Sequence, residues 1–102
     1  MDIKYRKSVG ALTVYVGGEL DECSASKAKD ILDNLLYEYA GSDKIIFDLS
    51  DVSFMDSTGV GLLIGRYKKI SALHKPVYIS GASPAADRVL TLAGIYSIMP
   101  KI

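Results

Sequence analysis

The sequence predicts an α/β fold in which helices pack against a mixed β-sheet of about four to five strands, opening with a β-hairpin. Two observations lead to this prediction. The first two segments alternate between apolar and polar side chains, which is typical of half-buried strands. After them, segments with helical periodicity alternate with short apolar runs that are typical of strands covered on both faces. Parallel strands of such a sheet are joined by right-handed crossovers.

The hairpin and the first helix account for the first forty residues. Residues 2–9 and 11–16 are the two alternating strands, and Gly10 lies where a hairpin turn is expected. Residues 24–40 carry apolar side chains at the spacing of one helical face. Ser24 is a plausible N-cap for this helix.

The remaining elements follow in a regular order. We expect a buried strand over 44–49, a helix over 57–73, a buried strand over 77–80, a helix from Ser83-Pro84 to Gly94, and a short extended piece over 98–102. Proline suits the first helical position because its φ is already fixed near the helical value. The segment between 49 and 57 is expected to be a loop. No linker or repeat interrupts the chain, so we expect one domain over residues 1–102.

Composition excludes several classes of protein. The 102 residues fit one domain, and Lys+Arg and Asp+Glu both total 12, so the net charge is near zero. A general nucleic-acid binder would show a basic excess. A membrane-surface helix would need a Lys/Arg-rich face, and no apolar run approaches the roughly 18 residues of a spanning helix. We therefore expect neither nucleic acid nor a membrane as a partner.

The only cysteine, Cys23, cannot form a disulfide within the chain, which favours a reducing compartment. The alternating N-terminus is not a signal peptide. Together these features predict a cytoplasmic protein.

The segment over residues 48–59 holds the candidate site, because it follows a buried strand and leads into a helix. Ligand and partner sites of α/β sheets favour this end of the strands. Asp48, Asp51 and Asp56 place three acids there with no Lys or Arg between them. They form either a solvated loop near a helix N-terminus or a docking patch for a basic partner surface.

Two hydroxyls, Ser57 and Thr58, stand at the expected helix start. Position alone favours a capping role, in which a side chain accepts hydrogen bonds from free backbone N–H groups. Asp56 could equally be the cap, which would leave Ser57 pointing outward.

Three glycines follow, at Gly59, Gly61 and Gly65, although glycine costs about 1 kcal/mol against alanine in a helix. They permit either close packing on the sheet or a smooth partner-facing surface. Phe54-Met55 either enters the core or forms an exposed contact.

The cationic side chains of the second helix, Arg66, Lys68 and Lys69, are expected on its solvated face. The only histidine, His74, lies near the end of that helix and suits its dipole there. We expect no metal site around it, because other nitrogen or sulfur ligands are lacking.

The ordered motifs give a family resemblance. Residues 54–68, Phe-Met-Asp-Ser-Thr-Gly-Val-Gly-Leu-Leu-Ile-Gly-Arg-Tyr-Lys, resemble the signature of bacterial anti-sigma factor antagonists, which are STAS domain proteins, and are most similar to the sporulation type. Gly18-Glu19-Leu20-Asp21 resembles the second signature of that family. Ser83-Pro84 and Leu92-Ala93-Gly94 match its later landmarks. The resemblance covers nearly the whole chain.

The resemblance implies a binding module rather than an enzyme, without a cofactor. Such proteins bind an anti-sigma factor that is also a serine kinase, and thereby release a sigma factor. Phosphorylation of Ser57 weakens the complex, and a PP2C-type serine phosphatase reverses it. Thr58 is a second possible acceptor, because the sporulation type often has a second serine there. The implied partner surface comprises Asp21, Asp56, Ser57, Thr58, Gly59 and Gly61. Family members usually continue into a further C-terminal helix, which is not expected in a sequence ending at Ile102.

Three other functions compete with this one. A phosphoacceptor receiver domain would use Asp48 with Mg²⁺, and Lys75-Pro76 superficially resembles that family, but the acid pair needed after the first strand is replaced by Ser8-Val9-Gly10. A hydrolase with Ser57 as nucleophile needs a base within hydrogen-bond reach, and His74 lies over four helical turns away. A scaffold in a larger stress-signalling assembly is disfavoured by the short chain and the sporulation-like signature.

Overall fold

The protein, described by a computed structural model over residues 1–102, consists of five strands, three helices and one 3₁₀ turn. The strands are β1 (Asp2–Ser8), β2 (Ala11–Leu20), β3 (Lys44–Asp48), β4 (Val52–Met55) and β5 (Val77–Ser80). The helices are α1 (Glu22–Glu38), α2 (Ser57–Ser71) and α3 (Pro84–Leu92), followed by the 3₁₀ turn η1 (Ile95–Ser97). The longest helix has 17 residues, and none combines the length and apolar character that a membrane span requires.

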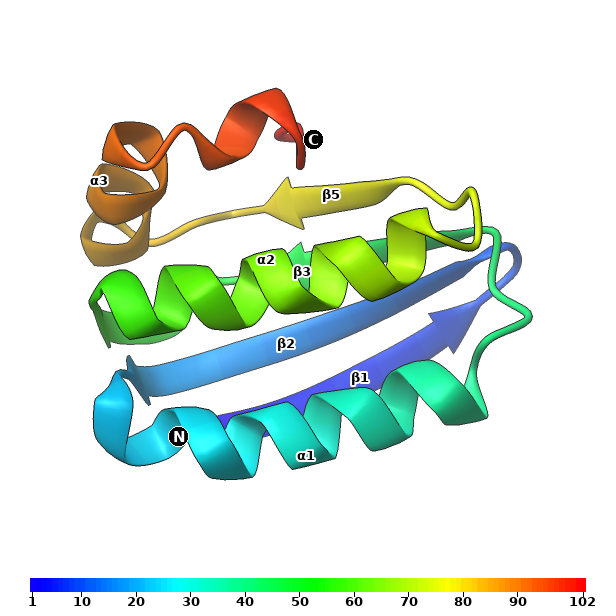
Figure 1. Cartoon of the computed structure of the whole chain (residues 1–102), viewed down its shortest axis with the longest axis horizontal. Helices are drawn as coiled ribbons and strands as arrows, with labels where there is room; N and C mark the ends of the chain where they lie inside the picture. The colour runs from blue at the N-terminus through cyan, green and yellow to red at the C-terminus, as the bar shows by residue number, and fades with distance from the viewer.

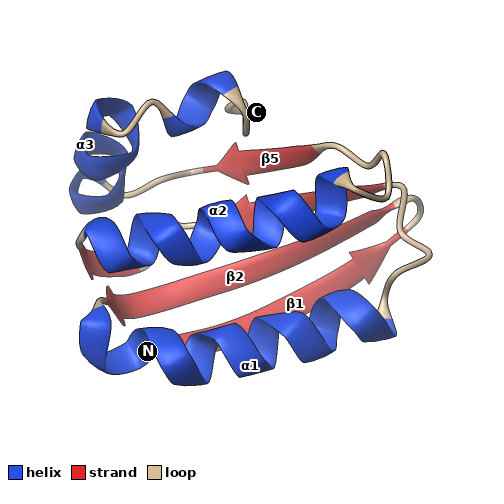
Figure 2. Ribbon diagram, viewed as in Figure 1, coloured by secondary structure: helices blue, strands red, loops and turns tan.

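The sheet is mixed, as the sequence predicts. Its strands lie in the order β1-β2-β3-β5, and β4 pairs separately with the end of β2. The hairpin β1–β2 is antiparallel, whereas the β2–β3, β2–β4 and β3–β5 pairs are parallel. Helices α1 and α2 run side by side across one face of this sheet (Figure 1), and α3 lies past the end of β5 (Figure 2) and contacts β4.

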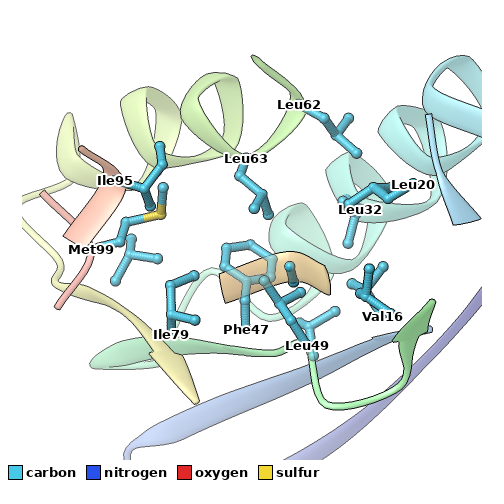
Figure 3. Close-up of a cluster of buried hydrophobic side chains, with 14 of the residues drawn as sticks. Val16, Leu20, Leu32, Phe47, Leu49, Leu62, Leu63, Ile79, Ile95 and Met99 are labelled. Atoms are coloured by element: carbon cyan, nitrogen blue, oxygen red, sulfur yellow. The ribbon is translucent and has the colours of Figure 1, made fainter. Parts of the chain in front are cut away.

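The core fills the space between the sheet and the helices (Figure 3). Alternate residues of β2, β3 and β5 point into it, including Val14, Val16, Phe47 and Ile79, each at most 1% exposed. Leu63 of α2 meets them from the helix layer and is also fully buried. Burying a side chain of this size stabilises the fold by about 1.5–3 kcal/mol, so the alternating strand pattern and the helical stripe both serve the same core.

Two strand boundaries differ from the prediction. β2 continues to Leu20 instead of ending at residue 16, and its ladder shifts register between Gly18 and Glu19. The expected loop before α2 contains the strand β4, which pairs with that extension. Of the two roles expected for this pair, Met55 enters the core and is 4% exposed, whereas Phe54 lies on the surface and is 49% exposed.

The segment from Tyr96 to Ile102 contacts α3 and β5. The backbone N–H of Ile102 donates to the carbonyl of Ile79 at 3.0 Å. The Tyr96 hydroxyl donates to Asp87 Oδ1 at 2.6 Å, and Lys101 Nζ lies 3.1 Å from the same oxygen. The hydrogen bond from Tyr96, followed by Lys101, lowers the pKa of Asp87. Burial, followed by the bond to Asp87, raises the pKa of Tyr96. The predicted extended piece is thus confirmed only at its last residues.

Arg66 is not on a solvated face, and that prediction is wrong. The residue is 4% exposed, and its Nε lies 2.9 Å from Oδ1 of Asp33 on α1. Lys69 Nζ lies 3.1 Å from the other oxygen of Asp33 and is itself well exposed. Arg66 is buried because its side of α2 packs against α1, a contact that helical periodicity within α2 does not reveal.

We expect substitutions at the two partners of this inter-helix ion pair to lower the free energy of unfolding by unequal amounts. Asp33→Ala would leave the buried guanidinium without an anion, at a cost of about 1–3 kcal/mol. Arg66→Met would leave Asp33 partly exposed and still paired with Lys69, so we expect a smaller loss. Urea unfolding of both variants measures the difference. Equal losses, or a larger loss for Arg66→Met, would contradict this role of Asp33.

Candidate functional site

Two strand-to-helix junctions lie next to each other at one end of the sheet. Leu20 of β2 pairs with Met55 of β4, and each is followed by an aspartate that caps a helix. Asp21 caps α1 and Asp56 caps α2, both in extended backbone conformation. Because the two strands are paired, α1 and α2 begin at the same edge of the sheet, as Figure 1 shows.

At the second junction, the cap is Asp56. Its Oδ1 accepts the backbone N–H of Thr58 at 2.9 Å and of Gly59 at 3.3 Å. Ser57 is therefore the first helical residue, it is exposed, and its hydroxyl takes no part in the cap. Of the two arrangements open from the sequence, the structure shows the one in which the serine is free.

At the first junction, the cap lies three residues earlier than predicted. Asp21 Oδ1 accepts from the backbone N–H groups of Cys23 and Ser24 at 3.0 and 3.1 Å. Ser24 Oγ in turn accepts the backbone N–H of Asp21 at 3.1 Å. Ser24 is thus the third helical residue of a capping box and not the N-cap, because the better acceptor, Asp21, lies at the strand end.

Removing either cap should destabilise the domain measurably. Asp21→Ala and Asp56→Ala each lose two hydrogen bonds to backbone N–H groups, and we expect each to lower the free energy of unfolding by about 1 kcal/mol. Asn at either position keeps an acceptor oxygen and should recover most of this loss. Chemical denaturation of the four variants checks the expectation, which fails if the alanine and asparagine variants are equally stable.

The glycines after Ser57 differ in how closely other atoms surround them. A Cβ on Gly59 would lie 2.7 Å from the Leu20 carbonyl oxygen and 3.0 Å from Met55 Cγ, so Gly59 permits the close approach of α2 to the sheet. A Cβ on Gly61 or Gly65 would meet no atom within 4 Å. Close packing therefore explains Gly59 alone.

Gly61 borders an open groove of about 510 Å³ between α1 and α2, which we call the α1/α2 groove. Its lining residues are Ala25, Ser26, Lys29, Thr58, Gly61, Leu62 and Arg66. The sequence did not indicate the α1 side of this groove. Helical spacing places Ser26 and Lys29 on a shared face of α1, but it does not tell which face of another helix they meet.

The three acids of the candidate segment lie in two separate places. Asp48 Oδ1 accepts from the backbone N–H and the hydroxyl of Ser50. With Asp51 it lines a hollow of about 260 Å³ that also includes Lys4 and Tyr15. Asp56 instead lies with Asp21 at the helix starts.

The geometry disfavours both enzyme-like alternatives. Asp48 pairs with Ser80 at the end of β5, whereas Lys75 precedes β5 and donates to the carbonyl of Ala40, so the two lie at opposite ends of the sheet. Ser57 begins α2 and His74 lies three residues beyond its last residue, Ser71, so the length of this 15-residue helix, roughly 22 Å, separates the regions in which they lie. Neither pair can act on one reacting group.

Comparisons with known proteins agree with this architecture. The model of the STAS domain family matches residues 2–102. The chain is 35% identical to an anti-sigma-B factor antagonist of Staphylococcus aureus over 86 residues, covering 84% of this chain and 78% of that protein. It is 29% identical to an anti-sigma F factor antagonist of Paenibacillus polymyxa over 100 residues, covering 98% and 85% of the two chains.

Solved structures show the same fold. The unphosphorylated form of the anti-sigma factor antagonist SpoIIAA superposes with a TM-score of 0.79 at 24% identity, covering 99% of this chain and 88% of that one. The phosphorylated form of SpoIIAA from Bacillus superposes with a TM-score of 0.71 at 23% identity, covering 99% and 91%.

The family model matches nearly the whole chain, and this chain therefore belongs to the STAS domain family. Within that family, its homologues include anti-sigma factor antagonists of the F and B types.

Proposed function

We propose that this protein is a cytoplasmic anti-sigma factor antagonist. It binds an anti-sigma factor with serine kinase activity and so releases a sigma factor. Phosphorylation of Ser57 inactivates it, and a PP2C-type phosphatase restores it. One observation carries the proposal: Ser57 is exposed at the first position of α2, and its hydroxyl is left free because Asp56 provides the cap.

The position of Ser57 suits a switch that leaves the fold intact. A phosphoserine carries about −1.5 to −2 charges at neutral pH. The first turn of a helix tolerates this charge, because its N–H groups and dipole favour anions. The Asp56 carboxylate opposes the phosphate only modestly where water screens both groups. Phosphorylation therefore lowers the affinity for the partner, because a dianion must be desolvated against a partner surface that fits a hydroxyl.

The surroundings of Ser57 suit a protein partner with basic character. Asp21, Glu22 and Asp56 give the two helix starts a negative rim, which would attract a basic surface. Phe54 adds an apolar side chain 49% exposed, and aromatic residues often anchor interfaces. Gly59 is buried, so its contribution is to hold α2 close to β2 rather than to contact the partner.

Release of a sigma factor tests the proposal directly. An anti-sigma factor with serine kinase activity from the same organism is loaded with its sigma factor, and the purified protein is added without ATP. We expect free sigma factor to appear on size-exclusion chromatography in proportion to the protein added. A complex that stays intact at a large excess of the protein, with no binding to the free anti-sigma factor either, would refute the proposed function.

A further inference from the structure

We propose that the α1/α2 groove is an anion subsite that binds an acidic side chain of the partner protein, with Arg66 and Lys29 as its cations. The inference rests on the proposed function, since the partner is the anti-sigma factor assigned there. It adds a second contact point, of opposite charge to the rim around Ser57.

The groove is basic although the helix starts beside it are acidic. Its seven lining residues include two cations, Lys29 and Arg66, and two hydroxyls, on Ser26 and Thr58, and no acid. Lys29 is exposed on the wall formed by α1. Thr58 follows Ser57 in the sequence, so the groove lies next to the proposed phosphorylation site.

The burial and incomplete hydrogen bonding of Arg66 indicate a ligand in the groove. Only 5% of its side chain is exposed, and its Nε lies 2.9 Å from Asp33 Oδ1, but its Nη1 atom is buried without a hydrogen-bond acceptor. Buried guanidinium groups nearly always find acceptors, and their planar fork matches a carboxylate.

The charges around Arg66 are also unbalanced. Asp33 is the single anion of the cluster, and it is shared between Arg66 and Lys69. Lys29 adds a further positive charge on the groove wall. A carboxylate entering from solvent would offset this excess and pair with Arg66 where that residue lines the groove.

The open shape of the groove favours a carboxylate that belongs to a protein surface. Its cations come from two helices that face solvent, so nothing encloses a free ion. Ser57 and Arg66 are nine residues apart on α2, about 13 Å along the helix axis. The matching partner surface thus presents a basic group at the rim and an acidic side chain about 13 Å away.

The test measures the affinity of the anti-sigma factor for two charge reversals on α1. Lys29→Glu places an acid in the groove, whereas Lys27→Glu makes the same change at an exposed position outside it. We expect Lys29→Glu to lower the affinity at least about tenfold at low salt and Lys27→Glu to change it less than about threefold. Lys29→Gln, which adds no acid one turn from Asp33, should lower it by an intermediate factor.

Each outcome decides between the groove and the function. If Lys29→Glu binds with wild-type affinity, or if both reversals lose the same affinity, the α1/α2 groove is not an anion subsite. The proposed function is unaffected by either result. Failure of the wild-type protein to bind the anti-sigma factor would overturn the proposed function, and with it the partner assigned to the groove. Circular dichroism of the two variants verifies that both remain folded.

Discussion

Gly59→Ala is expected to destabilise the domain, although alanine is the better helix former. The added Cβ would lie 2.7 Å from the Leu20 carbonyl oxygen, a backbone atom that cannot move aside as a side chain can. The first turn of α2 must then shift away from β2. Overpacking of this kind costs about 1–3 kcal/mol, and the shift would also displace Ser57 relative to the neighbouring start of α1.

Gly61→Ala is the matched control, two residues further along the same helix. Its Cβ meets no atom within 4 Å, so only the gain in helix propensity remains, about 0.5–1 kcal/mol. The two variants should therefore change the free energy of unfolding in opposite directions in urea denaturation. A stabilised Gly59→Ala would show that α2 does not pack as closely on β2 as the structure describes.

Ser57→Glu is expected to abolish most partner binding without unfolding the protein. The glutamate places a negative charge at the first position of α2, where the helix dipole favours it, so the melting temperature should stay within a few degrees of the wild-type value. At the interface the same charge must be desolvated, and a loss of 1.4 kcal/mol already lowers the affinity about tenfold. Titration calorimetry with the anti-sigma factor measures the loss.

Thr91→Glu serves as the control for added charge, because Thr91 is exposed on α3 outside the site. It should bind as tightly as the wild-type protein, and Ser57→Ala should bind nearly as tightly. Tight binding by Ser57→Glu would show that the hydroxyl lies outside the interface. Large chemical-shift changes throughout the phosphorylated protein would instead indicate a change of fold.

The parts of the fold with a local signal were predictable. Alternation indicated the β1–β2 hairpin, and helical spacing indicated α1 and α2, because each pattern repeats within one element. The candidate segment was found for the same reason, since it follows a predicted buried strand and leads into a predicted helix. Which of Asp56 and Ser57 caps α2 was not decided by the sequence, because both are good N-cap residues.

The rest depended on contacts between distant segments. The second strand was expected to end at residue 16, but the backbone N–H of Gly18 donates to the Asp51 carbonyl at 2.9 Å. A Cβ on Gly17 would come within 3.1 Å of Asp51 Cβ. These glycines let β4 dock, so the extension of β2 and the existence of β4 arise together. Arg66 was placed on the wrong face because its burial is created by α1.

Phosphate mapping tests the central claim most directly. The protein is incubated with ATP and the anti-sigma factor kinase that it binds, and the product is fragmented in a mass spectrometer. We expect one phosphate, on Ser57, that is absent from Ser57→Ala and whose presence lowers the affinity for the kinase at least about tenfold. A phosphate on Thr58 alone, or none from a kinase shown to be active on another substrate, would contradict the role assigned to Ser57.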